Sequence, residues 1–156
     1  GKIFSLTGWK VGMMTASPML MTPIAKAHQF LTFTTPPNLQ VAVAYGLAKD
    51  DNYFAALNAN MQAARDRLAD GLAEVGFEVI PCEGTYFIIT DFRPLGFNGD
   101  DIEFCRHITT EAGVAAVPVS AFYQSTGVDH FARFAFCKHS DSIDEAIRRL
   151  KSHFGA

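Results

Sequence analysis

Residues 1–12 read Gly-Lys-Ile-Phe-Ser-Leu-Thr-Gly-Trp-Lys-Val-Gly, and two lysines, Lys2 and Lys10, lie eight positions apart within them. Gly8 and Gly12 lack a Cβ, so the backbone at these positions can approach a ligand closely. Hydroxyl and indole side chains between the two lysines add a polar and aromatic lining. A lysine near the start of a chain is most often a solvated surface residue. The interest of this stretch therefore lies in the combination of residue types within one short window.

Beyond this stretch, the first part of the chain predicts one strand and two helices. Residues 11–15 are apolar and precede a Ser-Pro pair, which favours a strand. A helix is expected over 19–30, where Pro23 would be tolerated only in the first turn. A second helix is expected over 39–48, with Asn38 as its N-terminal cap.

The clearest periodic segment is 53–75, which predicts one long helix with a single apolar stripe. Gly76 is expected to end this helix. A stripe of this kind is far more often core than binding surface, and we assign it to the core. Its apolar residues recur at steps of three or four positions: Phe54, Leu57, Met61, Ala64, Leu68, Leu72 and Val75.

From residue 77 onward the pattern changes to strands separated by helices. Apolar runs with high β propensity predict strands near 77–80, 85–91, 114–119 and 130–136. The sequence therefore predicts an α/β chain whose second part is an α+β domain.

Two helices are expected among these strands. Asp100 and Glu103 form a capping pair for a helix that runs to Ala112. Ser140 or Asp141 would cap the last helix. The apolar face of the last helix consists of Ile143, Ile147, Leu150 and Phe154.

Arg133 lies in the middle of the last expected strand, between Ala132 and Phe134. A strand with two apolar faces seldom places an arginine centrally, because burying an unpaired charge is costly. Composition alone favours an ordinary explanation, in which Arg133 lies on an edge strand and is exposed to water. A binding role is the alternative.

Composition excludes several classes of function. The net charge is −3 and the basic residues are dispersed, so nucleic acid and anionic membranes are poor partners. No apolar run is long enough to span a membrane, and no secretory signal is visible. The five histidines form no ligand cluster, so no metal site is expected. The three cysteines are widely spaced and predict buried thiols in a reducing compartment, which favours the cytoplasm: Cys82, Cys105 and Cys137.

Residues 1–12 resemble the lysine signature of class I and II, fold type I, aminotransferases, which depend on pyridoxal 5'-phosphate. The resemblance is closest to the branch that holds kynurenine, methionine and N-succinyldiaminopimelate aminotransferases. It implies that Lys2 forms the Schiff base with the cofactor and acts in catalysis, while Lys10 holds the cofactor phosphate. A lysine supplies a point charge rather than a bidentate fork, so backbone N–H groups would also be needed.

The strand around Arg133 resembles the strand that carries the arginine for the substrate α-carboxylate in this family. The resemblance reverses the preference for an exposed edge arginine and implies that Arg133 binds substrate. Segments 84–87 and 117–123 resemble family segments beside the substrate. They would bring aromatic residues to the mouth of the pocket, among them Phe122.

The resemblance also implies the domain organisation. In the family the lysine lies well past the middle of a longer chain. We therefore expect this chain to be a C-terminal part, with residues 1–65 ending the large cofactor-binding domain and 66–156 forming the small α+β domain. The family forms homodimers, and the loop 31–37 would lie near the dimer interface.

The function implied is transamination between an amino acid and a 2-oxo acid by the parent protein. Alternatives are a C–S β-lyase of the same fold and a non-catalytic, aminotransferase-like regulatory domain. The chain on its own is expected to be inactive, because most of the cofactor pocket would be supplied by the rest of the parent protein. The sequence does not identify the amino acid substrate.

Overall fold

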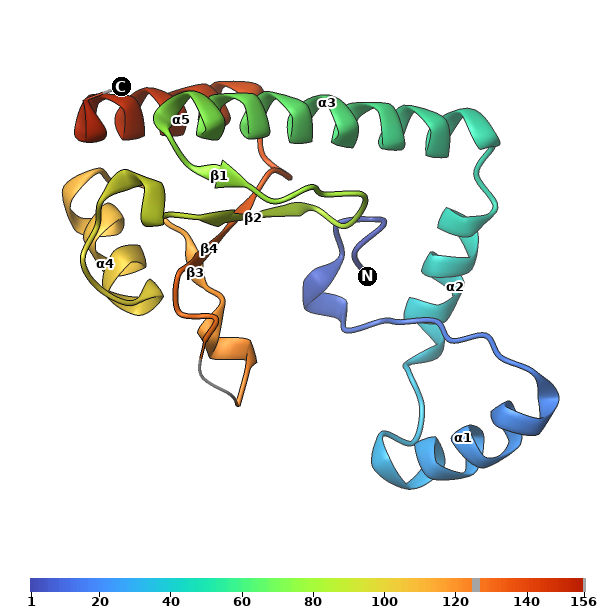
Figure 1. Ribbon diagram of the computed structural model, residues 1–156. Helices are drawn as coiled ribbons and strands as arrows, with labels where there is room; N and C mark the ends of the chain where they lie inside the picture. The colour runs from blue at the N-terminus through green and yellow to red at the C-terminus, as the bar shows by residue number, and fades with distance from the viewer. Residues whose placement is uncertain (125–126, 156) are drawn as a thin grey trace. The chain divides into compact units, whose positions relative to one another are not determined.

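The computed structural model describes residues 1–124 and 127–155 (Figure 1). The chain divides into two compact units, Gly1–Phe54 and Ala55–Ala156. The division falls near the start of one long helix, α3, which spans Asp51–Val75. The domain boundary expected near residue 65 falls in the same helix and stays a prediction.

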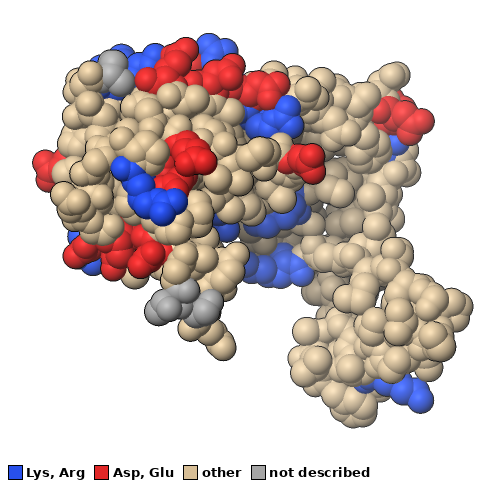
Figure 2. All heavy atoms as spheres, viewed as in Figure 1, with Lys and Arg blue, Asp and Glu red and all other residues tan. Residues whose placement is uncertain are grey.

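The first unit contains the 3-10 turn η1 (Thr7–Trp9) and the helices α1 (Pro18–Leu31) and α2 (Pro37–Leu47). All of its residues are described, and only Gly46 among them is buried. Figure 2 shows that the surface over α1 carries few charged atoms. The exposed apolar surface of the first unit is therefore extensive. The most exposed large apolar residues are Met13, Met19, Phe30, Leu31, Phe33, Val41 and Tyr45.

Both helices expected in the first unit are present, but three local predictions are wrong. Pro23 is the sixth residue of α1 and not in its first turn; it lacks the N–H that would bond the carbonyl four residues earlier. Asn38 is not the cap of α2, because the helix already begins at Pro37, where proline is favoured. Residues 11–15 form no strand, since no described segment pairs with them.

The second unit is built on a four-stranded antiparallel sheet with the strand order β1-β2-β4-β3. All four strands were expected, and each is shorter than its apolar run. Figure 1 shows α3 and α5 side by side along this sheet. The elements are β1 (Glu78–Val79), β2 (Phe87–Asp91), α4 (Asp101–Glu111), β3 (Val117–Pro118), β4 (Phe131–Ala135) and α5 (Ser140–Phe154), with the 3-10 turns η2 (Arg93–Leu95) and η3 (Ser120–Phe122).

One face of the sheet forms the core of this unit. Ile88 and Ala132 are fully buried there, and Phe104 of α4 stacks on Phe92 with ring centroids 4.1 Å apart. Such aromatic pairs add to the stabilisation from buried area. The expected stripe on α3 is buried at Leu68, Leu72 and Val75, and Met61 and Ala64 are partly buried against the same core.

In the second unit, most of the expected helix ends are present. Asp100 and Glu103 form the expected capping box of α4, and Gly76 and Gly113 adopt the positive φ angles that favour glycine. The cap expected for α5 is wrong, because the capping position is His139 and no side chain caps the helix.

The prediction of three buried thiols is correct for Cys105 only. Cys82 is half-buried and Cys137 is exposed. Burial, together with the charge of Asp101, raises the pKa of Cys105 to about 12.

We predict that Gly71→Ala destabilises the second unit. A Cβ at Gly71 would lie 2.6 Å from Cγ1 of Ile147, so α3 and α5 would have to separate. Overpacking of this kind costs about 1–3 kcal/mol, and helix propensity recovers at most about 1 kcal/mol. Urea denaturation should therefore show a net loss of stability.

Ile147→Val provides the matched control, because it removes the Cδ1 atom nearest to the added methyl group. The double variant should lose less free energy of unfolding than the sum of the losses in the two single variants. Unchanged stability of Gly71→Ala would contradict the close packing of α3 on α5.

We predict that the three thiols differ in reactivity toward iodoacetamide near pH 8. Cys137 is exposed and should react first, while Cys105 should resist, because a pKa of about 12 leaves almost no thiolate. Mass spectrometry of peptides gives the order of labelling. All three thiols should react in denaturant, and fast labelling of native Cys105 would refute the burial described.

Candidate functional site

The first eleven residues form a closed loop. The Gly1 nitrogen donates to the carbonyl oxygen of Val11 at 2.6 Å, and the Leu6 N–H donates to the carbonyl oxygen of Gly1 at 2.7 Å. The η1 turn reverses the chain between these contacts. The two ends of the segment therefore meet.

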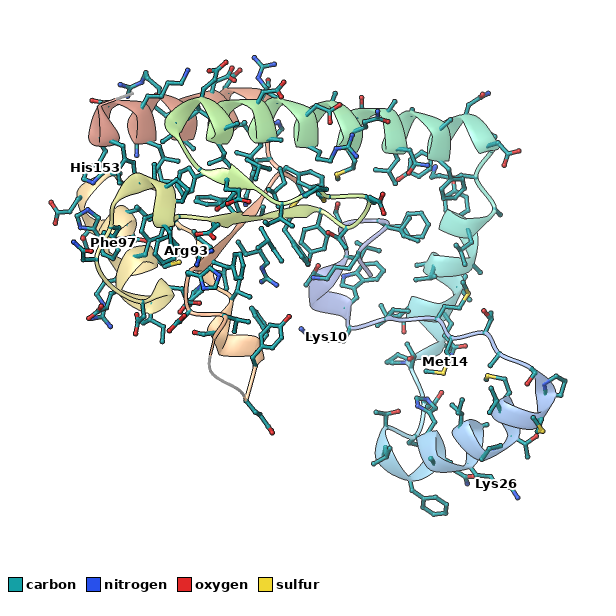
Figure 3. All side chains as sticks on the ribbon, viewed as in Figure 1. Lys10, Met14, Lys26, Arg93, Phe97 and His153 are labelled. Carbon is teal, nitrogen blue, oxygen red and sulfur yellow. The ribbon has the colours of Figure 1, made fainter. Side chains whose placement is uncertain are left out.

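This closure brings Lys2 and Lys10 to the same hollow, of about 410 Å³. Both side chains are exposed within the first unit, and Figure 3 shows Lys10 at the end of η1 with its side chain extending outward. The full lining is Gly1, Lys2, Ile3, Thr7, Lys10, Val11 and Gly12.

The backbone of this loop is held in an unusual conformation. Ser5 and Lys10 both have φ angles of 55°, in the left-handed region. Residues other than glycine adopt this region at a cost of about 1–3 kcal/mol, and they keep it only where the surrounding structure fixes them. The position of Lys10 is therefore set by the loop as a whole.

Phe4 anchors the loop to the rest of the first unit. A Cβ at Gly46 of α2 would lie 2.8 Å from Cζ of Phe4, so the ring fills a notch that only glycine leaves open. The Phe4 ring also stacks on Tyr53, with centroids 6.3 Å apart. The sequence analysis missed this anchor, because the contact joins positions far apart in the chain.

Arg133 lies in β4, between Ile89 of β2 and Val117 of β3. Its strand is interior, so the explanation of an exposed edge arginine is wrong. The guanidinium carbon lies 4.5 Å from the ring centroids of both Phe87 and Phe122. No carboxylate in residues 1–124 or 127–155 forms an ion pair with Arg133. A half-buried cation held by two rings is suited to binding an anionic group.

The chain before Phe87 is strained. Thr85 has a φ angle of 67°, an outlier for a β-branched residue. Nearby, the thiol of Cys82 donates to the carbonyl oxygen of Phe87 at 3.3 Å. Strain of this kind concentrates at functional sites. Thr85 lies two residues before Phe87, which with Phe122 and Arg133 forms what we call the arginine clamp.

The segment after β3 supplies the second ring. The carboxylate of Asp101 accepts hydrogen bonds from the N–H and the hydroxyl of Ser120, both at 2.7 Å. Ser120 begins η3, which ends at Phe122. Sequence analysis placed Phe122 near the site but missed Asp101, which no local motif distinguishes from a residue of the α4 first turn.

The structure thus brings Lys2 and Lys10 together, while Arg133 belongs to the second unit. The described residues contain no group of three or more His, Cys, Asp or Glu placed to hold a metal ion. No helix in the same ranges is both long and apolar enough to cross a membrane.

Comparison with known proteins identifies relatives for almost the whole chain. The probable N-succinyldiaminopimelate aminotransferase of Mycobacterium tuberculosis is 43% identical over 96% of this chain. The kynurenine–oxoglutarate transaminase of Dictyostelium discoideum is 34% identical, again over 96%. This chain spans only about 40% of the length of these relatives.

Structural comparison agrees with the sequence relatives. An Escherichia coli protein described as having a methionine aminotransferase function matches with a TM-score of 0.87 and 37% identity. The match covers 97% of this chain and 40% of that protein. The expected α/β fold of these aminotransferases, and the branch to which the lysine segment pointed, are therefore confirmed. Residues 1–150 match the family described as aminotransferase class I and II, and the chain belongs to that family.

Proposed function

We propose that the full-length protein carrying this chain is a pyridoxal-phosphate-dependent aminotransferase that transfers an amino group from an amino acid to a 2-oxo acid. The observation that carries the proposal is the pairing of Lys2 and Lys10 at one hollow, within a segment that matches the family. Because the chain spans about 40% of its relatives, the activity belongs to the whole protein.

The residues at the hollow fit this cofactor. Lys2 supplies a primary amine for the cofactor aldehyde, Lys10 supplies a cation for its phosphate, and Thr7 adds a hydroxyl group. A point charge satisfies a phosphate less completely than a bidentate fork, so further donors from the rest of the protein are part of the proposal. When bound, the cofactor supplies the electron sink for the reaction.

Lys2 has two tasks in this proposal. Its Nζ would hold the cofactor through the cofactor's aldehyde group, and the same amine would accept the proton from the substrate Cα as a general base. The hydrogen bonds from the Leu6 N–H to the Gly1 carbonyl and from the Ser5 N–H to the Lys2 carbonyl support this role, because they order the backbone from which Lys2 reaches.

Arg133 binds the substrate α-carboxylate in the same proposal. The rings of Phe87 and Phe122 pack on the guanidinium. Donors in the plane of the fork can then pair with two carboxylate oxygens. Fixing the carboxylate orients the Cα–H bond, a positional effect that is worth several kcal/mol.

The assembly we propose is a homodimer in the cytoplasm. It is supported by the exposed apolar surface of the first unit, including Phe30, Leu31 and Phe33 at the loop 31–37. A helix with such residues needs a covering surface. We also keep the proposal that the domain boundary of the whole protein lies near residue 65.

We predict that borohydride reduction of the cofactor-loaded full-length protein attaches the cofactor to Lys2. Lys2→Ala should abolish the adduct and transamination. Lys10→Ala should keep the adduct but weaken cofactor affinity about 10- to 100-fold, the loss of one hydrogen bond to a charged group. Peptide mapping and cofactor titration measure the two effects.

Lys26→Ala is the matched control, because Lys26 is exposed on α1 and lies outside the hollow. An adduct on another lysine would sink the assignment of Lys2. Turnover that needs no 2-oxo acid would indicate a β-lyase, and cofactor binding without turnover would indicate a regulatory domain.

We predict that Arg133→Gln raises the KM for the amino acid by about 30-fold or more, because truncating a charged hydrogen-bonding pair costs about 2–5 kcal/mol. Arg133→Lys should recover only part of the loss, since it keeps the charge without the fork. Steady-state kinetics with an amino acid and its amide test the carboxylate directly. Arg148→Gln, an exposed arginine of α5, should leave KM unchanged.

A further inference from the structure

Asp101 is an ionisable residue of the second unit that the proposed mechanism leaves without a task. Its side chain is fully buried, with 0% exposure. It forms no ion pair with any residue in the described ranges. A buried carboxylate without a cation is costly unless hydrogen bonds satisfy it. Two donors do so, the N–H and the hydroxyl of Ser120, and the N-terminus of α4 adds a favourable dipole.

The two bonds tie α4 to the turn η3, nineteen residues along the chain. Backbone pairing holds this turn weakly: β3 is only two residues long, and one of them is Pro118, which has no N–H. The N–H of Val119 reaches the carbonyl of Phe131 at 3.3 Å. Within the described residues, the Asp101 carboxylate thus supplies two hydrogen bonds that link η3 to α4.

Phe122 depends on this link. Its side chain is 60% exposed, so core packing does not hold it in place. Its ring nevertheless lies 4.5 Å from the guanidinium carbon of Arg133. The conformation of η3 sets where the ring lies, through the bonds from Phe122 N–H to Val119 and from Tyr123 N–H to Ser120.

We propose that Asp101 is a positioning residue for Arg133. By holding both donors of Ser120, its carboxylate fixes η3 and places the Phe122 ring against the guanidinium, so that the fork is oriented before substrate arrives. The inference rests on the proposed function, in which Arg133 binds the substrate carboxylate. Asp101 itself acts through Phe122 and touches no reacting atom.

The test compares KM and kcat in the full-length protein. Ser120→Ala removes one of the two bonds and should raise the KM for the amino acid about tenfold. Asp101→Asn replaces one of the two accepting oxygens with an NH2 group, which cannot accept a hydrogen bond from Ser120. This variant should raise KM further. Cofactor affinity should stay unchanged in both variants, and Ser120→Thr, which keeps the hydroxyl, should restore KM.

A double-variant cycle separates positioning from general structural damage. Phe122→Leu should raise KM by itself, and adding Asp101→Asn should then have little further effect, because both changes remove the same ring placement. Additive effects in this cycle would overturn the inference.

Asp100→Ala is the matched control. Asp100 is the neighbouring residue and caps the same helix by accepting from the N–H of Glu103 at 2.8 Å, whereas the Ser120 donors bond to Asp101. It should lower thermal stability and leave KM unchanged. If Asp101→Asn does not fold, the inference is tested by the KM of Ser120→Ala and by a double-variant cycle of Ser120→Ala with Phe122→Leu.

Two failures are distinguishable. A normal KM in Arg133→Gln would remove the proposed role of Arg133 in binding the substrate carboxylate, and with it the basis of the inference. A raised KM in Arg133→Gln, with normal values in Ser120→Ala and Asp101→Asn, would overturn the role of Asp101 alone.

Discussion

The antiparallel pairing of β2 with β4 is the interaction on which the second unit depends. Five residue pairs, from Phe87↔Ala135 to Asp91↔Phe131, fix which side chains face the helices. Ile88 and Ala132 enter the core, while Phe87 and Arg133 fall on the opposite face. Because side chains alternate along a strand, a slip of one residue would turn Arg133 into the core. The register that builds the core thus also builds the arginine clamp.

The second unit contains two buried carboxylates, Asp91 and Asp101, which are stabilised differently. Burial raises the pKa of Asp91, but hydrogen bonds from Arg93 outweigh it and hold that pKa below its ordinary value. Asp101 relies instead on neutral donors and a helix N-terminus. Asp91 is therefore satisfied within its own turn, whereas Asp101 is satisfied only by a distant segment. The two hydrogen bonds of Asp101 therefore link α4 to η3, whereas those of Asp91 stay within adjacent residues.

Local sequence patterns predicted the elements that depend on interactions between residues close together in the chain. The period of 53–75, the capping box at Asp100 and the positive φ of Gly76 all follow from near neighbours. The lysine segment and Arg133 could be nominated from the sequence, but the loop closure and the ring clamp could not. Phe4 in its notch and Asp101 on Ser120 join residues 42 and 19 positions apart, which no window captures. The predictions at Pro23, at 11–15 and at the caps of α2 and α5 were wrong for one reason. At each place the surrounding structure, rather than the local preference of the residues, decided the backbone conformation.

The burial of a single residue, Gly46, in the first 54 positions has a consequence for how stability is distributed along the chain. Free energy of local opening follows buried apolar contact, so it is lowest where side chains face outward. The second unit carries one contiguous hydrophobic core. Residues 1–54 have no comparable core and are held by local contacts, such as Phe4 in the notch at Gly46. Opening of the lysine loop therefore costs less free energy than opening of the sheet.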